Sequence, residues 1–99
     1  MENDNLVHLI GRLVPKPGKE AELAQAIKDI TPDVLREPGC IAYIPHESQS
    51  SAGTIVMIET WASQEALNRH FTAPSFTRIA ARFANILDGE VSIEKLKKI

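Results

Sequence analysis

Alternating apolar and polar residues predict strands near both ends of the chain and in its middle. Residues 6–14 are β-rich and apolar, and Pro15 ends this strand because proline lacks the N–H that a sheet ladder needs. Residues 54–61 give the strongest pattern, with apolar side chains on both alternating faces, which is typical of a strand covered on both sides. The predicted strands are 6–14, 40–44, 54–61 and a last short strand that alternates from Val91 to Lys95, with a polar loop at 46–53.

A helix is predicted between the first two strands. From Leu23 to Val34, apolar residues recur at i, i+4, i+7 and i+11, so they form one stripe on a helix. Pro32 lies inside this stripe, and it must either kink the helix or begin a second one with Thr31 as the N-cap. The turn at 37–39 ends the segment.

Two further helices are predicted between the third and fourth strands. Ser63 can cap a short helix that runs through His70 or Phe71. Pro74 suits the first turn of the next helix, since its missing N–H is not needed there. The apolar stripe of that second helix consists of Phe76, Ile79, Ala80, Phe83 and Leu87.

This order of elements predicts a fold class and an assembly. Strand, helix, strand, strand, helix, strand is the order of a ferredoxin-like α+β plait, which is an antiparallel sheet with helices on one face. The other face of such a sheet would be wet in a monomer, whereas residues 54–61 are apolar on both sides. A second subunit on the open face is the simplest explanation, and a two-fold dimer is the commonest oligomer. We therefore expect a homodimer.

Composition narrows the classes of function. The 99 residues predict one domain, 1–99, with a structured core at about 6–97. The net charge of −2 and the absence of a basic stripe argue against nucleic-acid binding. Cys40 is the single cysteine, which excludes an intramolecular disulfide. The longest apolar run, 40–44, is too short to cross a bilayer, and the first five residues carry no targeting pattern, so we expect a cytoplasmic protein.

No strong catalytic motif is present, and the candidates for chemistry are isolated side chains. Glu59 interrupts the most apolar strand and shares a face with Trp61. A covered carboxylate needs a partner or a raised pKa, so Glu59 is either in an ion pair, for example with Arg12, or an acid or base in a pocket. Trp61 is either a core residue or an aromatic wall for a planar ligand.

The three histidines differ in context. His70 ends a short helix and could exchange a proton near neutral pH, although a solvated or capping histidine fits the spacing equally well. We expect His8 on the dimer face or the surface, and His46 in a solvated loop. No pair of histidines has metal-ligand spacing, so no metal site is predicted. Cys40 and Met57 are most simply core residues.

Four short segments, in their order and spacing, resemble a known family. The chain is similar over roughly 7–96 to the antibiotic biosynthesis monooxygenase (ABM) family, and most similar to its quinol monooxygenase subgroup. The segments that carry this resemblance are Pro17-Gly18-Lys19, Glu37-Pro38-Gly39-Cys40, Ile58-Glu59-Thr60-Trp61 and Glu65-Ala66-Leu67-Asn68-Arg69-His70.

The resemblance implies a dimeric α+β barrel that oxidises a quinol or another aromatic hydroxyl compound with O2, without metal or flavin. An electron-rich phenolate can itself pass an electron to oxygen, so the protein need only bind the ring, remove a proton and exclude water. His70 would be the catalytic proton acceptor, and Glu59 would orient or tune a neighbour. Trp61 would be the aromatic wall against the substrate ring, and Met57 and Phe71 would also bind the substrate.

The chain departs from the family pattern at several positions. Many relatives have a second histidine directly after the proline of the turn, where this chain has Ser75. Haem-degrading relatives carry an asparagine and a histidine at positions that correspond to Gly11 and about Ala80. Only Trp61 of that haem set is present, so haem degradation is not expected.

Two other functions stay open at this point. Some relatives isomerise small phosphorylated carbonyl signals, and a phosphate would need basic side chains in the pocket. Alternatively, the chain is a non-catalytic, dimeric small-molecule-binding module of a stress response, which the serine in place of the second histidine favours. The obvious sources of positive charge for a phosphate are Arg12, Arg69, Arg78 and Arg82.

Overall fold

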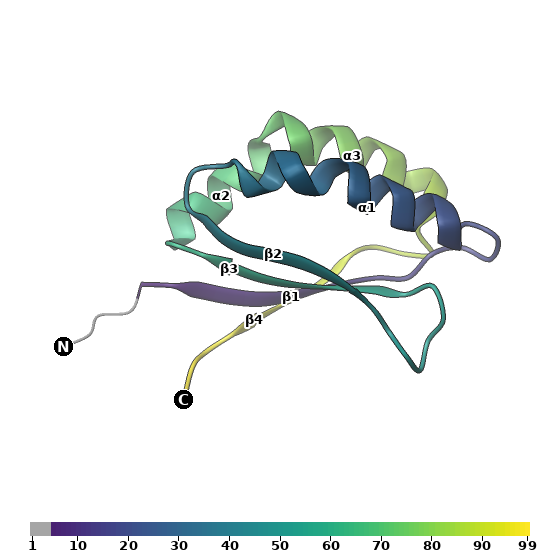
Figure 1. The fold of residues 1–99 in the computed structure, drawn as a ribbon, viewed down its shortest axis with the longest axis horizontal. Coiled ribbons are helices and arrows are strands. Elements are labelled where there is room, and N and C mark those ends of the chain that lie inside the picture. The colour runs from purple at the N-terminus through teal and green to yellow at the C-terminus, as the bar shows by residue number, and fades with distance from the viewer. Residues whose placement is uncertain (1–4) are drawn as a thin grey trace.

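Three helices cover one face of a four-stranded antiparallel sheet in the computed structural model, which describes residues 5–99 (Figure 1). The strand order is β2-β3-β1-β4. This arrangement confirms the predicted ferredoxin-like α+β fold. Residues 1–4, most of the stretch in which no targeting pattern is found, lie outside the described part. The elements are β1 (Val7–Leu13), α1 (Glu20–Leu35), β2 (Cys40–Glu47), β3 (Ile55–Trp61), α2 (Gln64–Thr72), α3 (Pro74–Ile86) and β4 (Ser92–Leu96).

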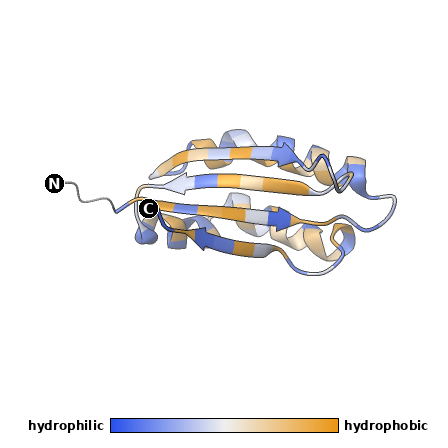
Figure 2. Ribbon diagram, turned by 90° about the horizontal axis from the view of Figure 1, so that it is seen from below, coloured by the Kyte–Doolittle hydropathy of each residue, from blue (hydrophilic) through white to orange (hydrophobic). Residues whose placement is uncertain are grey.

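The two faces of the sheet have different surroundings. On β3, alternate side chains from Ile55 to Trp61 are buried under the helices. Ile58 points the other way and is 46% exposed. Figure 2 looks onto this open face and shows apolar residues along the central strands. The helices thus cover only one of the two apolar faces that the sequence pattern predicts.

Helix α1 continues through Pro32, so the alternative of a second helix that begins there is wrong. Thr31 is not an N-cap, because its hydroxyl donates a 2.7 Å hydrogen bond to the carbonyl of Ile27 in the preceding turn. A proline inside a helix removes one ladder hydrogen bond. The buried stripe on both sides of Pro32, which includes Ile30 and Val34, holds the helix against the sheet despite that loss.

Most strand boundaries shift by a single residue, and two larger differences from the predictions occur at β2 and at the end of α3. Strand β2 extends to Glu47 and includes Pro45 and His46, which were expected outside it. The extension is possible because β2 is an edge strand, where a missing N–H is tolerated. Leu87 was expected in the last helix, but it follows α3 and forms an isolated bridge with Pro15.

The loop before β2 packs directly on α2. Ser63 caps α2 as predicted, accepting a 3.1 Å hydrogen bond from the backbone N–H of Ala66. Gly39 has a φ of +85°, and a Cβ there would lie only 2.5 Å from the Cβ of Ala66. Only glycine allows this approach. The approach brings Glu37, two residues before Gly39, close to the C-terminal half of α2.

Candidate functional site

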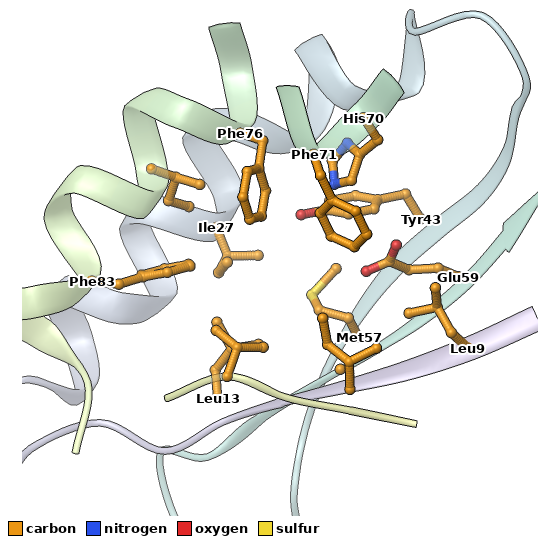
Figure 3. A pocket seen from close by; sticks show the side chains of 14 residues that line it. Leu9, Leu13, Ile27, Tyr43, Met57, Glu59, His70, Phe71, Phe76 and Phe83 are labelled. Atoms are coloured by element: carbon orange, nitrogen blue, oxygen red, sulfur yellow. The ribbon is translucent and has the colours of Figure 1, made fainter. Parts of the chain in front are cut away.

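A small cavity of about 60 Å³ lies between the helices and the sheet (Figure 3). Among the described residues that line it, only Tyr43, Glu59 and His70 carry a side-chain oxygen or nitrogen. These three side chains gather at one end of the cavity in Figure 3, whereas Phe83 lies at the other end. The remaining lining residues are Leu9, Gly11, Leu13, Ile27, Met57, Phe71, Phe76, Ile79, Val91 and Ile93.

The imidazole of His70 is held by the partly buried carboxylate of Glu37. His70 is 4% exposed, and its Nδ1 lies 2.8 Å from Oε1 of Glu37. The hydroxyl of Ser75 donates to the other oxygen of Glu37, at 2.5 Å. Because a carboxylate can only accept hydrogen bonds, Nδ1 of His70 carries the proton in this pair. Nε2, to which no residue of 5–99 donates or accepts a hydrogen bond, is then left as a proton acceptor.

Glu37 is a site residue that the sequence analysis missed. It lies 33 positions before His70 and 38 before Ser75, so only the tertiary packing brings the three together. The available signal was an acidic residue directly before the Pro38-Gly39 turn, and solvated glutamates are common at such turns. Ser75, the residue after the turn proline, therefore contributes to the site, because its hydroxyl helps to hold Glu37.

Trp61 supports His70 and Glu59 from within the core. Its ring centroid lies 4.7 Å from that of His70, and its indole N–H donates a 2.9 Å hydrogen bond to Oε1 of Glu59. Trp61 is 0% exposed and does not line the cavity. The structure thus places Trp61 in the core and not in the wall of the cavity. Its indole contacts Glu59 and His70 instead. Met57 and Phe71, by contrast, do line the cavity.

Glu59 is buried without an ion pair to any residue of 5–99. The expected partner, Arg12, lies opposite Val56 and is exposed, since its position in β1 faces away from the helices. Burial raises the pKa of Glu59, and the hydrogen bond from Trp61 and the nearby His70 only partly oppose that shift. The second oxygen, Oε2, accepts no hydrogen bond from the described residues. The cavity therefore contains a carboxyl group whose pKa is higher than that of a solvated glutamate.

Tyr43 completes the polar end of the cavity. Its phenol comes from the edge strand β2, and its ring centroid lies 6.0 Å from that of His70. Burial raises the pKa of Tyr43, and the carboxylates of Glu59 and Glu37 raise it further. The hydroxyl stays protonated at physiological pH and can donate a hydrogen bond.

The other candidates lie outside the cavity. His8 is paired with Thr60 through a 3.1 Å contact between Nδ1 and the threonine hydroxyl. His46 is exposed in β2. Burial, with Glu37 and Glu59 nearby, raises the pKa of Cys40 to about 11, so its thiol stays protonated. Within residues 5–99 no cluster of three or more histidine, cysteine or acidic residues could hold a metal ion.

The arginines that could bind a phosphate lie on other surfaces. Arg69 forms a 3.6 Å ion pair with Glu65, and Arg78 forms a 3.0 Å ion pair with Asp33. Neither arginine lines the cavity, and the described lining contains no lysine. No helix in the described part of the chain is long and apolar enough to span a bilayer.

Comparison with known proteins gives a consistent result. The family model described as antibiotic biosynthesis monooxygenase matches residues 6–82. The chain is 27% identical over 90 residues to Rv0793 of Mycobacterium tuberculosis, which is provisionally named a monooxygenase; the match covers 91% of this chain and 88% of Rv0793. The solved structure of Rv0793 superposes with a TM-score of 0.87, at 26% identity and 95% coverage of both chains.

Two further solved structures have the same fold. PA3566 from Pseudomonas aeruginosa superposes with a TM-score of 0.90 at 24% identity, covering 100% of this chain and 99% of that one. A Caulobacter crescentus protein with a provisional antibiotic biosynthesis monooxygenase name superposes with a TM-score of 0.88 at 27% identity, covering 97% and 92% of the two chains.

Proposed function

Because the chain belongs to the antibiotic biosynthesis monooxygenase family, we propose that it oxidises a quinol or another aromatic hydroxyl compound with O2, without a resident cofactor. One observation carries the proposal. An apolar cavity ends in three polar side chains, of which His70 is oriented by Glu37 so that its free nitrogen can accept a proton. A flat apolar ring with a hydroxyl group at one end matches the polarity of this site.

Entry of a ring requires the aromatic lining to move. A cavity of about 60 Å³ holds water-sized molecules and is smaller than typical ligand pockets of roughly 300–1,000 Å³. Phe71, Phe76 and Phe83 pack against the core but are only partly buried, so their outward rotation would open space that the ring of the ligand fills. Once inside, the ring is enclosed by aromatic and aliphatic groups, and bulk water is excluded from it.

The residues then promote the loss of one proton. Nε2 of His70 accepts the proton of the ligand hydroxyl, and Glu37 stabilises the imidazolium that results. The phenol of Tyr43 donates a hydrogen bond to a ligand oxygen, and Glu59 forms a second hydrogen bond, as donor when it is protonated and as acceptor when it is ionised. Met57 and Phe71 contact the ring, while Trp61 fixes Glu59 and His70 as a positioning residue.

The deprotonated ring supplies the electrons for the remaining steps. It passes one electron to O2, and the ring radical and superoxide combine to form a carbon–oxygen bond. Cleavage of the O–O bond leaves one oxygen on the ring as a carbonyl and releases the other as water. The balance is one hydroquinone and one O2 to one hydroxyquinone and one water.

The proposal includes a homodimer formed through the open face of the sheet. Exposed apolar residues such as Ile44 and Ile58 lie on that face, and Figure 2 shows the apolar stretches of the strands to which they belong. Contiguous exposed apolar patches mark interaction sites. A second copy would cover the same residues on both subunits about a two-fold axis. The apolar residues concerned are Ile10, Ile44, Val56, Ile58 and Leu96.

The test is oxygen uptake over freshly reduced menadione, with the spontaneous rate subtracted and ¹⁸O₂ as a label. The wild type should accelerate uptake, place one labelled oxygen on the quinone and keep its rate in a metal chelator. His70→Asn keeps a donor toward Glu37 but has no Nε2, so its rate should fall on the order of 100-fold. His46→Asn, a change at an exposed histidine, is the matched control and should keep the rate.

Two results would contradict the proposal. Uptake at the spontaneous rate, together with tight binding of the reduced quinone, would instead make the chain a non-catalytic binding module. Hydrogen peroxide without label on the quinone would show electron transfer without oxygenation. The isomerase alternative has no structural support, because no described lining residue carries a positive charge apart from a protonated His70.

A further inference from the structure

Gly11 occupies an unusual position for a glycine. It lies in the middle of β1, between Met57 of β3 and Ile93 of β4, and it is buried in the floor of the cavity. Its φ is not positive, so the backbone conformation is one that any residue can adopt. Glycine inside a strand weakens the strand, and it often marks a place where a ligand approaches closely. The absence of a side chain at Gly11 leaves space in the floor of the cavity.

The space that a side chain would fill lies in front of Glu59. A Cβ at Gly11 would lie 3.7 Å from the Cβ of Met57 and 4.0 Å from Oε2 of Glu59. Both are ordinary van der Waals distances, so the fold itself could accommodate a methyl group. Oε2 is the carboxyl oxygen that receives no hydrogen bond from the described residues, although Glu59 is only 7% exposed.

We propose that Gly11 is a specificity-determining residue, which leaves open a recess through which an oxygen substituent of an aromatic ligand reaches Oε2 of Glu59. The inference takes its ligand class from the proposed function. Glu59 is already fixed by Trp61 through Oε1, so Oε2 has a defined position. A neutral carboxyl donates from Oε2 to a ligand oxygen, and an ionised one accepts from a ligand hydroxyl. In either state the recess selects a ring that carries oxygen at this end.

The test compares the binding of 2-naphthol and naphthalene, which have the same ring system but differ by one hydroxyl group. Binding is measured at equilibrium under nitrogen, so that no oxidation is needed for the result. The wild type should bind 2-naphthol at least about tenfold more tightly than naphthalene. Gly11→Ala should reduce that preference to about twofold or less while the protein stays folded.

Two further variants make the result specific. Val91→Ile adds one carbon elsewhere in the lining, and it should leave the preference for the hydroxyl unchanged. Glu59→Gln replaces the carboxyl group at the recess by an amide of nearly the same size and leaves Gly11 unchanged. If Gly11 acts through Glu59, the double variant Gly11→Ala/Glu59→Gln should lose no more preference than Gly11→Ala alone.

Two results with the variants would overturn the inference. One is an unchanged preference in Gly11→Ala, which includes an equal loss of affinity for both probes. The other is additive losses of preference in the double variant. Failure of wild type to bind either probe would also overturn it. None of these outcomes depends on turnover. A protein that shows the preference but consumes no O2 would contradict the proposed oxygenase activity and would still support the proposed role of Gly11.

Discussion

Oε1 of Glu37 lies 2.8 Å from Nδ1 of His70, and the other oxygen of the same carboxylate accepts the hydroxyl of Ser75. One carboxylate therefore ties the end of α2 and the start of α3 to the loop before β2. The hydroxyl of Ser75 takes part in orienting His70, so the residue that replaces a family histidine has a role in the same site. The orientation of the imidazole is consequently a property of three segments, not of α2 alone.

Glu37→Gln should impair the reaction more than it impairs the fold. A glutamine amide can donate to Nδ1, which would place the proton on Nε2 and remove the proton acceptor. We expect oxygen uptake over reduced menadione to fall on the order of 100-fold. The control is Glu47→Gln, at an exposed carboxylate in β2. Equal rates for the two variants would contradict the positioning role of Glu37.

Phe76→Ala should widen the site. The side chain is partly buried and lines the cavity, so the substitution removes apolar contacts and opens space next to His70. We expect a loss of about 2 kcal/mol in the free energy of unfolding, less than the roughly 3–5 kcal/mol for a fully buried phenylalanine. Polycyclic phenols should bind more tightly relative to single-ring phenols, as measured by calorimetry. A loss of affinity for both classes would show that Phe76 does not limit the cavity.

The buried carboxyl of Glu59 predicts a pH-dependent stability. Burial raises the pKa of Glu59 in the folded protein, so the native state binds more protons than the unfolded state above pH 4.5. The contribution of this group to the free energy of unfolding is therefore greatest below pH 4.5 and is lost as the pH rises through the folded pKa. Urea unfolding of wild type and Glu59→Gln between pH 4.5 and pH 8 checks this. The stability of the wild type should fall relative to that of the variant as the pH increases; parallel curves would show that Glu59 keeps an ordinary pKa.

Ile58→Lys should disrupt the proposed dimer without disturbing the cavity. Ile58 is on the open face and 46% exposed, so a lysine there is well solvated in a single chain. In a dimer the substitution would place two charges in an apolar interface. Sedimentation should show a dimer for wild type and a monomer for Ile58→Lys. Lys28→Glu, a charge change on the outer face of α1, is the control; a monomeric wild type would refute the dimer directly.

Much of the fold was predictable because its signals are local. The alternation in β3, the stripe in α1, the cap at Ser63 and the helix start at Pro74 depend only on neighbouring residues, and the structure confirms these elements. The sequence did not decide whether α1 continues past Pro32. The apolar stripe favours one continuous helix and Pro32 opposes it, and only the packing against the sheet determines the outcome.

The site was predictable only in part, since it depends on contacts between distant segments. Glu59, His70 and Trp61 were singled out as unusual residues in their own elements. The pairing of His70 with Glu37 cannot be read from spacing, and neither can the use of the Trp61 indole by Glu59. Alternation places Glu59 and Trp61 on one face but does not say which of them reaches the cavity.

The contact between Gly39 and Ala66 fixes the distance between the loop that carries Glu37 and the helix that carries His70. Because a Cβ at Gly39 would lie 2.5 Å from the Cβ of Ala66, the loop and helix α2 are already as close as two backbones of this kind can come. Any larger residue at either position would push α2 outward and lengthen the reach from Glu37 to His70. The position of this imidazole thus depends on two small residues that do not line the cavity.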